Sequence, residues 1–475
     1  MHYSYSFSSD LEQEWEWTET YPRQAEILRY LNHVADRFDL RRDIQFNTRV
    51  ISAIYDTITN RWSLQTNQGD QASARYCITA MGCLSTPNIP AFPGLASFAG
   101  QVYHTGQWPH TGVDFSGRRV GVIGTGSTGI QVIPQIAKQA EHVTVFQRTA
   151  NYSLPAHNRP LTVEEKARVK ATYRTLRQTD RESFAGFTPR YTNMPSAHSV
   201  TAEERQKAFE EAWAVGGVQA LGVFSDVGIN LQANAYLADF VRSKIAEIVQ
   251  NSETARLLMP HDHPIGSKRI CVDTEYYETY NRANVTLVDV RASPIEEITP
   301  TGLRTRAADY SLDAIVFATG FDAMTGALFK VDIRGTNGQA LKEKWAAGPR
   351  TYLGLMTADF PNLFIITGPG SPSVLSNMTV SIEQHAEWIA DCLRYLRDHR
   401  ITRIEPVVEA EDAWVSHVNE VASHTLFPLA NSWYLGANIP GKPRIFMPYV
   451  GGVGNYRNKC LEIAKKGYEG FALTV

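Results

Sequence analysis

The residues best placed to do chemistry form a glycine-rich turn, Gly124 to Gly129, with the sequence GTGSTG. An apolar stretch precedes the turn, helical spacing follows it, and a second apolar stretch begins at His142. This order is typical of a βαβ unit whose turn receives a pyrophosphate, because glycine allows the tight bend and the helix N-terminus supplies partial positive charge. The turn therefore predicts a dinucleotide site rather than a glycine-rich loop without a ligand. We expect its lining residues to be Thr125, Gly126, Ser127, Thr128, Gly129, Ile130 and Gln131.

The segment after the second apolar stretch selects between the two nicotinamide cofactors. An NAD site places an acidic residue here to hold the ribose 2′-hydroxyl, whereas this chain has Gln147, Arg148 and Thr149. A guanidinium and a hydroxyl suit the 2′-phosphate of NADP. We therefore expect Arg148 and Thr149 to bind NADP. The alternative is that Arg148 is an ordinary solvated surface arginine.

A second pattern lies just before the turn, where Phe98, Gly100, His104, Trp108 and Pro109 match F-x-G-x-x-x-H-x-x-x-W-P. On these residues the chain resembles the Baeyer–Villiger monooxygenases, over essentially its whole length and closest to the phenylacetone and cyclohexanone monooxygenase group. The resemblance implies that NADPH reduces FAD, that dioxygen adds to give a peroxyflavin, and that a ketone becomes an ester or lactone. Flavin monooxygenases that oxidise nitrogen or sulfur share the first seven positions but usually lack Trp-Pro, so heteroatom oxidation is the alternative activity.

The resemblance also implies roles for residues outside the two patterns. In the stretch HPIGSKR it implies that Arg269 is the cation that stabilises negative charge during oxygen transfer, and that Lys268 is a second contact to the 2′-phosphate. It implies that Trp433 reaches the nicotinamide cofactor and that Met378 lies near the flavin. Two further positions that match FAD contacts in the family are Tyr3 and Val50. No metal site is expected.

These residues require an α/β scaffold, and the resemblance implies a two-dinucleotide-binding-domain flavoprotein with Rossmann-like FAD and NADP domains. We expect residues 1–85 to form the first part of the FAD domain and residues 318–475 its second part. Residues 86–317 are expected to form the NADP domain, with a helical insertion at about 151–259. Two capping boxes support the helical insertion, Thr162 with Glu165 and Thr201 with Glu204.

Hydrophobic periodicity gives the remaining elements. Residues 24–38 and 385–399 have the spacing of amphipathic helices, and the aromatic-rich residues before 24 are expected to hold no helix or strand. Strands are expected at residues 44–55, 62–66, 74–80, 118–123, 142–146, 285–288, 297–298, 314–318, 363–367 and 444–449.

One part of the family's pattern has no counterpart in the sequence. Members carry an earlier G-x-G-x-x-G that holds the ADP half of FAD, and the only such motif here is the one at Gly124. We therefore expect the first FAD βαβ unit to be missing. Two interpretations stay open: an N-terminally incomplete record of a working enzyme, or a short NADP-binding protein without flavin activity.

The composition and the net charge indicate which partners and which compartment to expect. The 475 residues are 43% hydrophobic and carry a net charge of −3, which gives no electrostatic reason to expect nucleic acid as a partner. The five cysteines contain no C-x-x-C pair, and no apolar run is long enough to span a membrane. We expect a monomer in the cytoplasm, whose partners are a small ketone and dioxygen.

Overall fold

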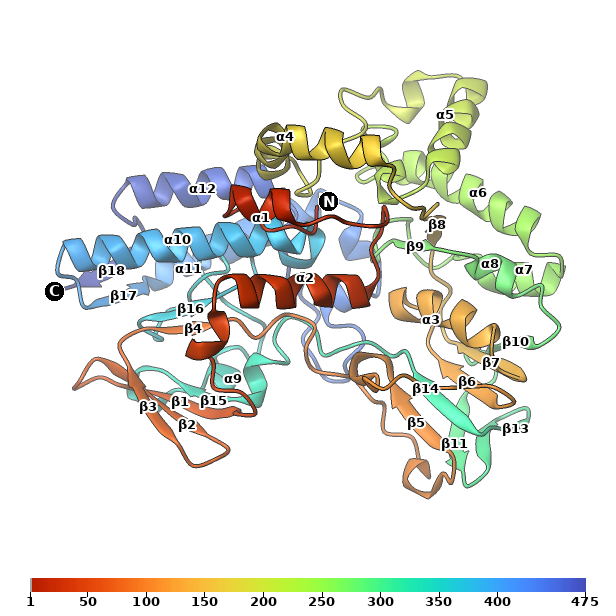
Figure 1. The fold of residues 1–475 in the computed structure, drawn as a ribbon, viewed down its shortest axis with the longest axis horizontal. Coiled ribbons are helices and arrows are strands. Elements are labelled where there is room, and N and C mark those ends of the chain that lie inside the picture. The colour runs from red at the N-terminus through yellow and green to blue at the C-terminus, as the bar shows by residue number, and fades with distance from the viewer. Residues whose placement is uncertain (1) are drawn as a thin grey trace.

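The computed structural model describes residues 2–475, and it places two groups of strands side by side beneath a layer of helices (Figure 1). The group on the right in Figure 1 contains a five-stranded parallel sheet with the order β10-β7-β6-β14-β5. The three central strands β6, β7 and β14 are buried over most of their length, because both faces of the sheet are covered there. The strands are β5 (Gln101–His104), β6 (Arg119–Ile123), β7 (His142–Gln147), β10 (Val285–Asp289) and β14 (Ala314–Phe317).

The helix α3 (Ser127–Ala137) covers one face of this sheet and buries Ile130, Ile133 and Ile136 against it. The predicted strand, glycine turn, helix and second strand are thus confirmed as β6, turn, α3 and β7. The other face packs on a small antiparallel sheet, and Leu303 and Phe317 are buried between them. That sheet consists of β11 (Ile295–Thr299), β12 (Gly302–Thr305) and β13 (Asp309–Ser311).

Helices dominate the segment between β7 and β10, as predicted. Both capping boxes are formed: Thr162 accepts a hydrogen bond from the backbone of Glu165 at the start of α4, and Thr201 does the same for Glu204 at α5. The helices are α4 (Val163–Glu182), α5 (Ala202–Val215), α6 (Leu231–Ile248), α7 (Ser252–Leu258) and α8 (Tyr276–Thr279). A short parallel pair, β8 (Ser153–Pro155) with β9 (Cys271–Asp273), was not predicted.

The group on the left in Figure 1 holds a four-stranded sheet with the order β15-β1-β2-β3 and a two-stranded parallel sheet of β4 and β16. The long helix α10 packs Trp388, Ile389 and Cys392 into the core that contains Phe364 of β16. The strands are β1 (Val50–Asp56), β2 (Arg61–Thr66), β3 (Gln71–Ala74), β4 (Cys77–Thr79), β15 (Asp332–Arg334) and β16 (Leu363–Ile365). The helices are α9 (Leu341–Lys344), α10 (Met378–Asp398), α11 (Val408–Ser423) and α12 (Val453–Lys465).

The expected domain boundaries fall at two connections. Residue 86 lies between β4 and β5, and residue 318 follows β14 directly. At the second boundary the chain leaves the five-stranded sheet for the left-hand group, so the order of strands along the chain alternates between the two groups. The division into FAD and NADP domains stays a prediction.

The predicted helix over residues 24–38 is confirmed as α2 (Gln24–Arg37), but the expectation that no helix precedes it is wrong. The helix α1 (Ser9–Glu14) forms because Ser8 accepts a hydrogen bond from the backbone N–H of Leu11 and caps it. The aromatic residues then become core: Trp15, Trp17 and Tyr30 pack ring against ring at centroid distances of 5.1–5.7 Å.

Three strand predictions need correction. Residues 44–49 are irregular, and only Val50–Asp56 of the predicted 44–55 forms a strand. Residues 74–80 divide between β3 and β4, which belong to different sheets. Residues 444–449 form no strand, because they bond to loops on both sides, as in Met447 N–H to Tyr434 O at 3.0 Å, and Pro448 lacks the N–H that a ladder needs. The tail instead ends in β18 (Phe471–Thr474), which pairs with β17 (Arg403–Pro406).

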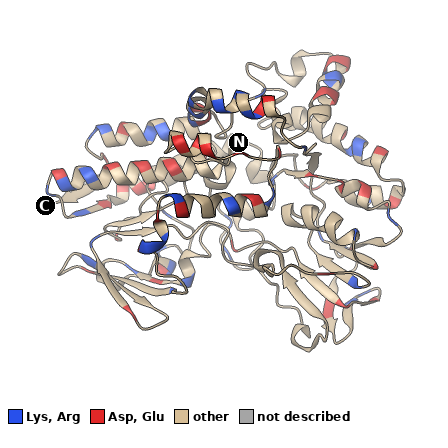
Figure 2. Ribbon diagram, in the orientation of Figure 1, with Lys and Arg blue, Asp and Glu red and all other residues tan. Residues whose placement is uncertain are grey.

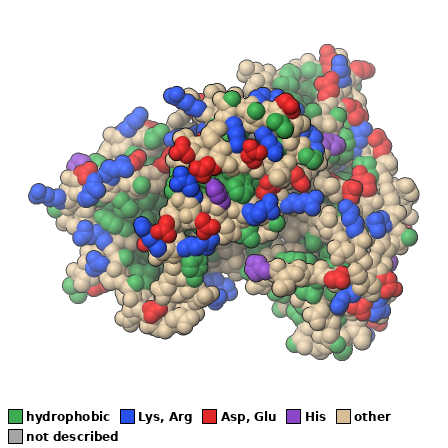
Figure 3. All heavy atoms as spheres, in the orientation of Figure 1, with side chains coloured by type: hydrophobic (Ala, Val, Ile, Leu, Met, Phe, Trp, Pro, Cys, Tyr) green, Lys and Arg blue, Asp and Glu red, His purple; other side chains and the backbone are tan. Residues whose placement is uncertain are grey.

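Charges of both signs alternate along the helices, and neither sign dominates the face in Figure 2. No helix within residues 2–475 is long and apolar enough to cross a membrane. The same face is hollowed between the left-hand and right-hand groups (Figure 3).

Candidate functional site

The glycine turn has the geometry that a pyrophosphate requires. Gly124 has a φ of 107°, and a Cβ at this position would lie 2.6 Å from the carbonyl oxygen of Ala318. A Cβ at Gly129 would lie 2.3 Å from Gly124 O, so side chains are excluded at both positions. A Cβ at Gly126, the N-cap of α3, would meet nothing within 4 Å. The backbone at Gly126 therefore faces open space at a helix N-terminus, which fits a bound phosphate.

The other residues predicted to line the turn have different surroundings. Thr125 is buried, and its hydroxyl donates to Thr149 O at 3.0 Å, which ties the turn to the end of β7. Ser127 Oγ lies 3.2 Å from Cys271 Sγ, and the Gln131 amide donates to Ser127 O. Ile130 is fully buried in the core, and Thr128 is half-buried on the first turn of α3. Direct contact of these residues with a cofactor stays a prediction.

The structure brings the predicted 2′-phosphate residues together. Arg148 and Thr149 follow β7, and Lys268 comes from the loop after α7. Burial lowers the pKa of the Lys268 ammonium, and the nearby charges of Arg148 and Arg291 lower it further, while Asp262 opposes them. Lys268 therefore lies within electrostatic reach of two arginines. Sequence reasoning singled out neither Arg291 nor Asp262, because both lie outside the glycine motif.

Arg269 lies where the loop after α7 meets the segment that precedes α10. Its Nη1 donates to the carbonyl oxygen of Val374 at 2.5 Å, and its own carbonyl accepts from the Asn151 amide at 3.3 Å. Its side chain is exposed on one side, and no carboxylate within residues 2–475 pairs with it in a salt bridge. The guanidinium is thus held by a neutral carbonyl, and its charge is not neutralised by an acid.

An apolar cluster lies beside this cation and contacts it through Val374. Burial raises the pKa of the Cys83 thiol, and it raises the pKa of the Tyr434 phenol to about 12. The positive charge of Arg269 opposes both shifts. Cys83, Tyr434 and Val374 belong to one buried cluster, and Met378 and Trp433 pack against it. Tyr434 was missed by sequence reasoning, although it neighbours the predicted Trp433 and their ring centroids lie 4.3 Å apart.

This cluster fits one end of a flavin. An apolar wall with an unneutralised cation at its edge suits a planar ring that gains negative charge. Tyr3 lies near Arg269, because the charge of Arg269 lowers the pKa of the Tyr3 phenol, which burial raises. Val50 lies apart, as the first residue of β1 in the left-hand group. For the pyrophosphate of FAD, residues 2–475 hold no second glycine turn of the G-x-G-x-x-G kind.

Two fingerprint residues before the glycine turn, His104 and Trp108, pack against neighbouring aromatic rings. His104 is buried, its Nδ1 accepts from the backbone of Gly106 at 3.0 Å, and its ring meets Phe321 edge-on at 5.9 Å. Trp108 packs against Phe115 at a ring distance of 6.1 Å. Because Phe321 follows β14, His104 lies where the chain passes between the two groups of strands. This placement is consistent with a role at the connection between the two groups of strands.

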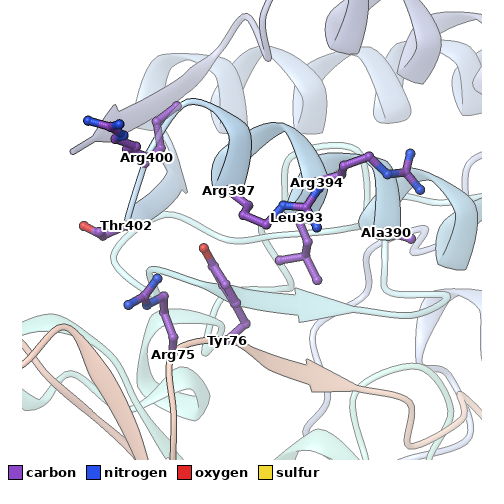
Figure 4. A pocket seen from close by; sticks show the side chains of 9 residues that line it. Arg75, Tyr76, Ala390, Leu393, Arg394, Arg397, Arg400 and Thr402 are labelled. Atoms are coloured by element: carbon purple, nitrogen blue, oxygen red, sulfur yellow. The ribbon is translucent and has the colours of Figure 1, made fainter.

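A separate hollow of about 760 Å³ lies between the C-terminal end of α10 and the turn before β4 (Figure 4). Four arginines line it: Arg75, Arg394, Arg397 and Arg400. Their side chains do not converge, since Arg394 and Arg400 point in opposite directions in Figure 4. Arg394 and Arg397 also form salt bridges with Asp391 and Asp398. The four arginines of this hollow therefore do not form a common anion-binding site.

Comparison with known proteins finds similar sequences across nearly the whole chain. Residues 9–159 match the flavin-binding monooxygenase-like family. The chain is 44% identical over 469 residues to a Baeyer–Villiger monooxygenase of Pseudooceanicola batsensis, covering 98% of this chain and 85% of that protein. It is 42% identical over 476 residues to phenazine N-monooxygenase PhzNO1 of Lysobacter antibioticus, covering 99% of this chain and 86% of that protein.

Solved structures share the fold. Oxidized steroid monooxygenase bound to NADP superposes with a TM-score of 0.94 at 52% identity, covering all of this chain and 89% of the other. OTEMO in complex with FAD and NADP superposes with a TM-score of 0.94 at 39% identity, covering 98% of this chain and 87% of the other.

Proposed function

The chain belongs to the Baeyer–Villiger monooxygenases, and we propose that it uses NADPH, FAD and dioxygen to insert one oxygen atom beside the carbonyl of a ketone, which gives an ester or lactone. The observation that carries this proposal is the position of Arg269. Its guanidinium lies at the edge of an apolar cluster, is held by Val374 O and has no acidic partner within residues 2–475. Such a cation stabilises an oxygen that gains negative charge.

When bound, NADPH supplies a hydride and FAD supplies the redox chemistry that activates dioxygen. The residues of the chain would bind the two cofactors, orient them and shield the reacting atoms from water. Arg148, Thr149 and Lys268 would hold the 2′-phosphate, and the open space at the Gly126 backbone would receive the pyrophosphate. Trp433 and Met378 pack against the cluster beside Arg269, where Trp433 would contact the nicotinamide cofactor and Met378 would lie beside the flavin.

The apolar cluster next to Arg269 supports an uncharged substrate. It contains Cys83, Val374 and Phe446, Leu375 and Met378 pack against it, and Arg269 bonds to Val374 O at its edge. An apolar surface beside a cation favours an uncharged ketone over a charged substrate. Arg269 then stabilises the negative charge that develops on the carbonyl oxygen.

Oxidation of nitrogen is a second candidate, and one observation favours it. A relative of 42% identity is a phenazine N-monooxygenase, although this chain carries the Trp108-Pro109 pair that heteroatom-oxidising enzymes usually lack. An uncharged aromatic amine would also suit the apolar wall.

The spectrum and the products of the purified chain test the proposal together. We expect flavin absorption bands, NADPH consumption that depends on cyclohexanone, and a lactone product by gas chromatography. A tertiary amine in place of the ketone tests N-oxide formation. A colourless protein, or one that consumes NADPH with cyclohexanone and makes only hydrogen peroxide, would overturn the proposal.

We further propose that the chain works as a monomer in the cytoplasm. All five cysteines within residues 2–475 carry free thiols, which suits a reducing compartment. Light scattering on the purified protein tests the monomer.

A further inference from the structure

We propose that Arg291 is a third cation for the 2′-phosphate of NADP, an inference that rests on the proposed use of NADPH and names a residue that sets its selectivity. Arg291 follows β10 just as Arg148 follows β7. The two strands are parallel neighbours, with Val288 opposite Phe146 and Asp289 opposite Gln147. Their carboxyl ends therefore meet at one edge of the sheet, the edge at which dinucleotides bind.

The contacts of Arg291 place its guanidinium over the predicted phosphate segment. Its Nε donates to Arg148 O at 3.1 Å, and its Nη2 donates to the Thr149 hydroxyl at 3.0 Å. A third bond runs from Nη2 to Asp262 Oδ2 at 2.9 Å. Its Nη1 has no hydrogen-bond partner within residues 2–475, and 57% of the side chain is exposed. Two N–H donors of a positioned guanidinium are thus open to a ligand.

Charge at this edge favours an anion. Arg148, Lys268 and Arg291 lie close enough that the two arginines lower the pKa of the Lys268 ammonium. Two carboxylates lie at this edge: Asp262 pairs with the Arg291 side chain, and Asp289 accepts a hydrogen bond from the Arg291 backbone. Three cations against two carboxylates leave positive charge in excess. A 2′-phosphate carries close to two negative charges near neutral pH and accepts several charge-assisted hydrogen bonds.

Asp262 positions the guanidinium. Burial raises the pKa of this carboxyl, but hydrogen bonds from His263 and Arg291 outweigh it and lower the pKa to about 2. Asp262 Oδ1 lies 2.7 Å from Nδ1 of His263, a buried ring, so the carboxylate is fixed on the protein side. A guanidinium held in this way loses little conformational freedom when it binds a phosphate.

Two nucleotides that differ only in the 2′-phosphate test the inference: adenosine 2′,5′-bisphosphate and 5′-AMP, titrated into the full chain by calorimetry. We expect Arg291→Ala to weaken binding of the bisphosphate about 10-fold and to leave AMP binding within about 2-fold, as loss of a charge-assisted pair predicts. The affinity of Arg291→Lys for the bisphosphate is expected to lie between those of the wild type and Arg291→Ala, because lysine keeps the charge and loses the planar guanidinium. Arg306→Ala, which removes an exposed arginine of the same domain, is the matched control.

Unchanged bisphosphate binding by Arg291→Ala would overturn the inference, and so would an equal loss for both nucleotides. Neither probe carries a nicotinamide, so the result does not depend on flavin or on oxygen transfer. If the chain forms no ester but Arg291→Ala still weakens binding of the bisphosphate and not of AMP, the proposed function fails and this inference stands.

Discussion

Arg269 donates its Nη1 hydrogen to the carbonyl oxygen of Val374 at 2.5 Å, across 105 residues of sequence. The bond joins the loop after α7, which also carries Lys268, to the segment that leads into α10. A neutral carbonyl therefore sets the position of the guanidinium, and the full positive charge stays available. Movement of either segment would move the cation.

Replacement of Arg269 tests its role in oxygen transfer. We expect Arg269→Ala to lower ester formation by about 100-fold or more, the typical cost of removing one electrostatic stabiliser, while NADPH oxidation continues. Ester measured by gas chromatography and NADPH measured by absorbance give the ratio between the two. Arg306→Ala serves as the control, and an unchanged ester yield from Arg269→Ala would exclude the role.

Replacement of Arg148 tests the choice of cofactor. Arg148→Ala removes a cation beside Lys268 and Arg291, so we expect it to raise the KM for NADPH by about 10-fold and to leave the KM for NADH nearly unchanged. Steady-state kinetics with both cofactors measure the two values. An equal rise for NADPH and NADH would contradict a 2′-phosphate contact.

Replacement of Tyr456 tests a buried hydrogen-bond chain beneath the loop before α10. The backbone of Thr367 donates to His385 Nδ1 at 2.9 Å, the Tyr456 hydroxyl lies 2.9 Å from His385 Nε2, and it donates to Leu353 O at 2.6 Å. Because Nδ1 accepts, the ring proton lies on Nε2 and points at the hydroxyl. Tyr456→Phe leaves both buried partners unsatisfied.

We expect Tyr456→Phe to lower the free energy of unfolding by ~2 kcal/mol in urea titrations. Tyr395→Phe is the matched control, since its hydroxyl has no hydrogen-bond partner in the part of the chain that the structure describes. Equal stability of the two variants would show that the chain of bonds contributes little.

The same histidine predicts a pH dependence of stability. Burial lowers the pKa of His385 to about 3, from 6.5 for the exposed ring. Between these two values the unfolded chain binds a proton that the folded chain does not, so stability falls as the pH falls below about 6.5. The slope attributable to this group approaches ~1.4 kcal/mol per pH unit.

Urea titrations of the wild type and of His385→Gln between about pH 4 and about pH 7, which cover most of this window, measure the slope. We expect the variant to lose most of the slope. His399→Gln, on the exposed C-terminal end of the same helix, is expected to keep it. A slope unchanged in His385→Gln would place its origin in other groups.

The sequence predicted the glycine turn and its flanking elements correctly because their determinants are local. Gly124, Gly126 and Gly129 lie within one turn, and the capping boxes of α4 and α5 need only residues three apart. The errors came where tertiary contacts override local pattern. Residues 444–449 form an apolar run that predicts a strand, but they bond to loops. The helix α1 depends on a single capping serine beside an aromatic core.

By itself, then, the sequence determined the class of chemistry: the turn at Gly124, the cation at Arg148 and the family fingerprint are all read along the chain. The tertiary structure decided which distant groups act together. Arg269 meets Val374, and Arg291 meets Thr149 across 142 residues, only because the register of β7 and β10 and the packing of α10 bring them together. Contacts of this kind depend on how elements pack, and packing leaves no fixed spacing in the sequence.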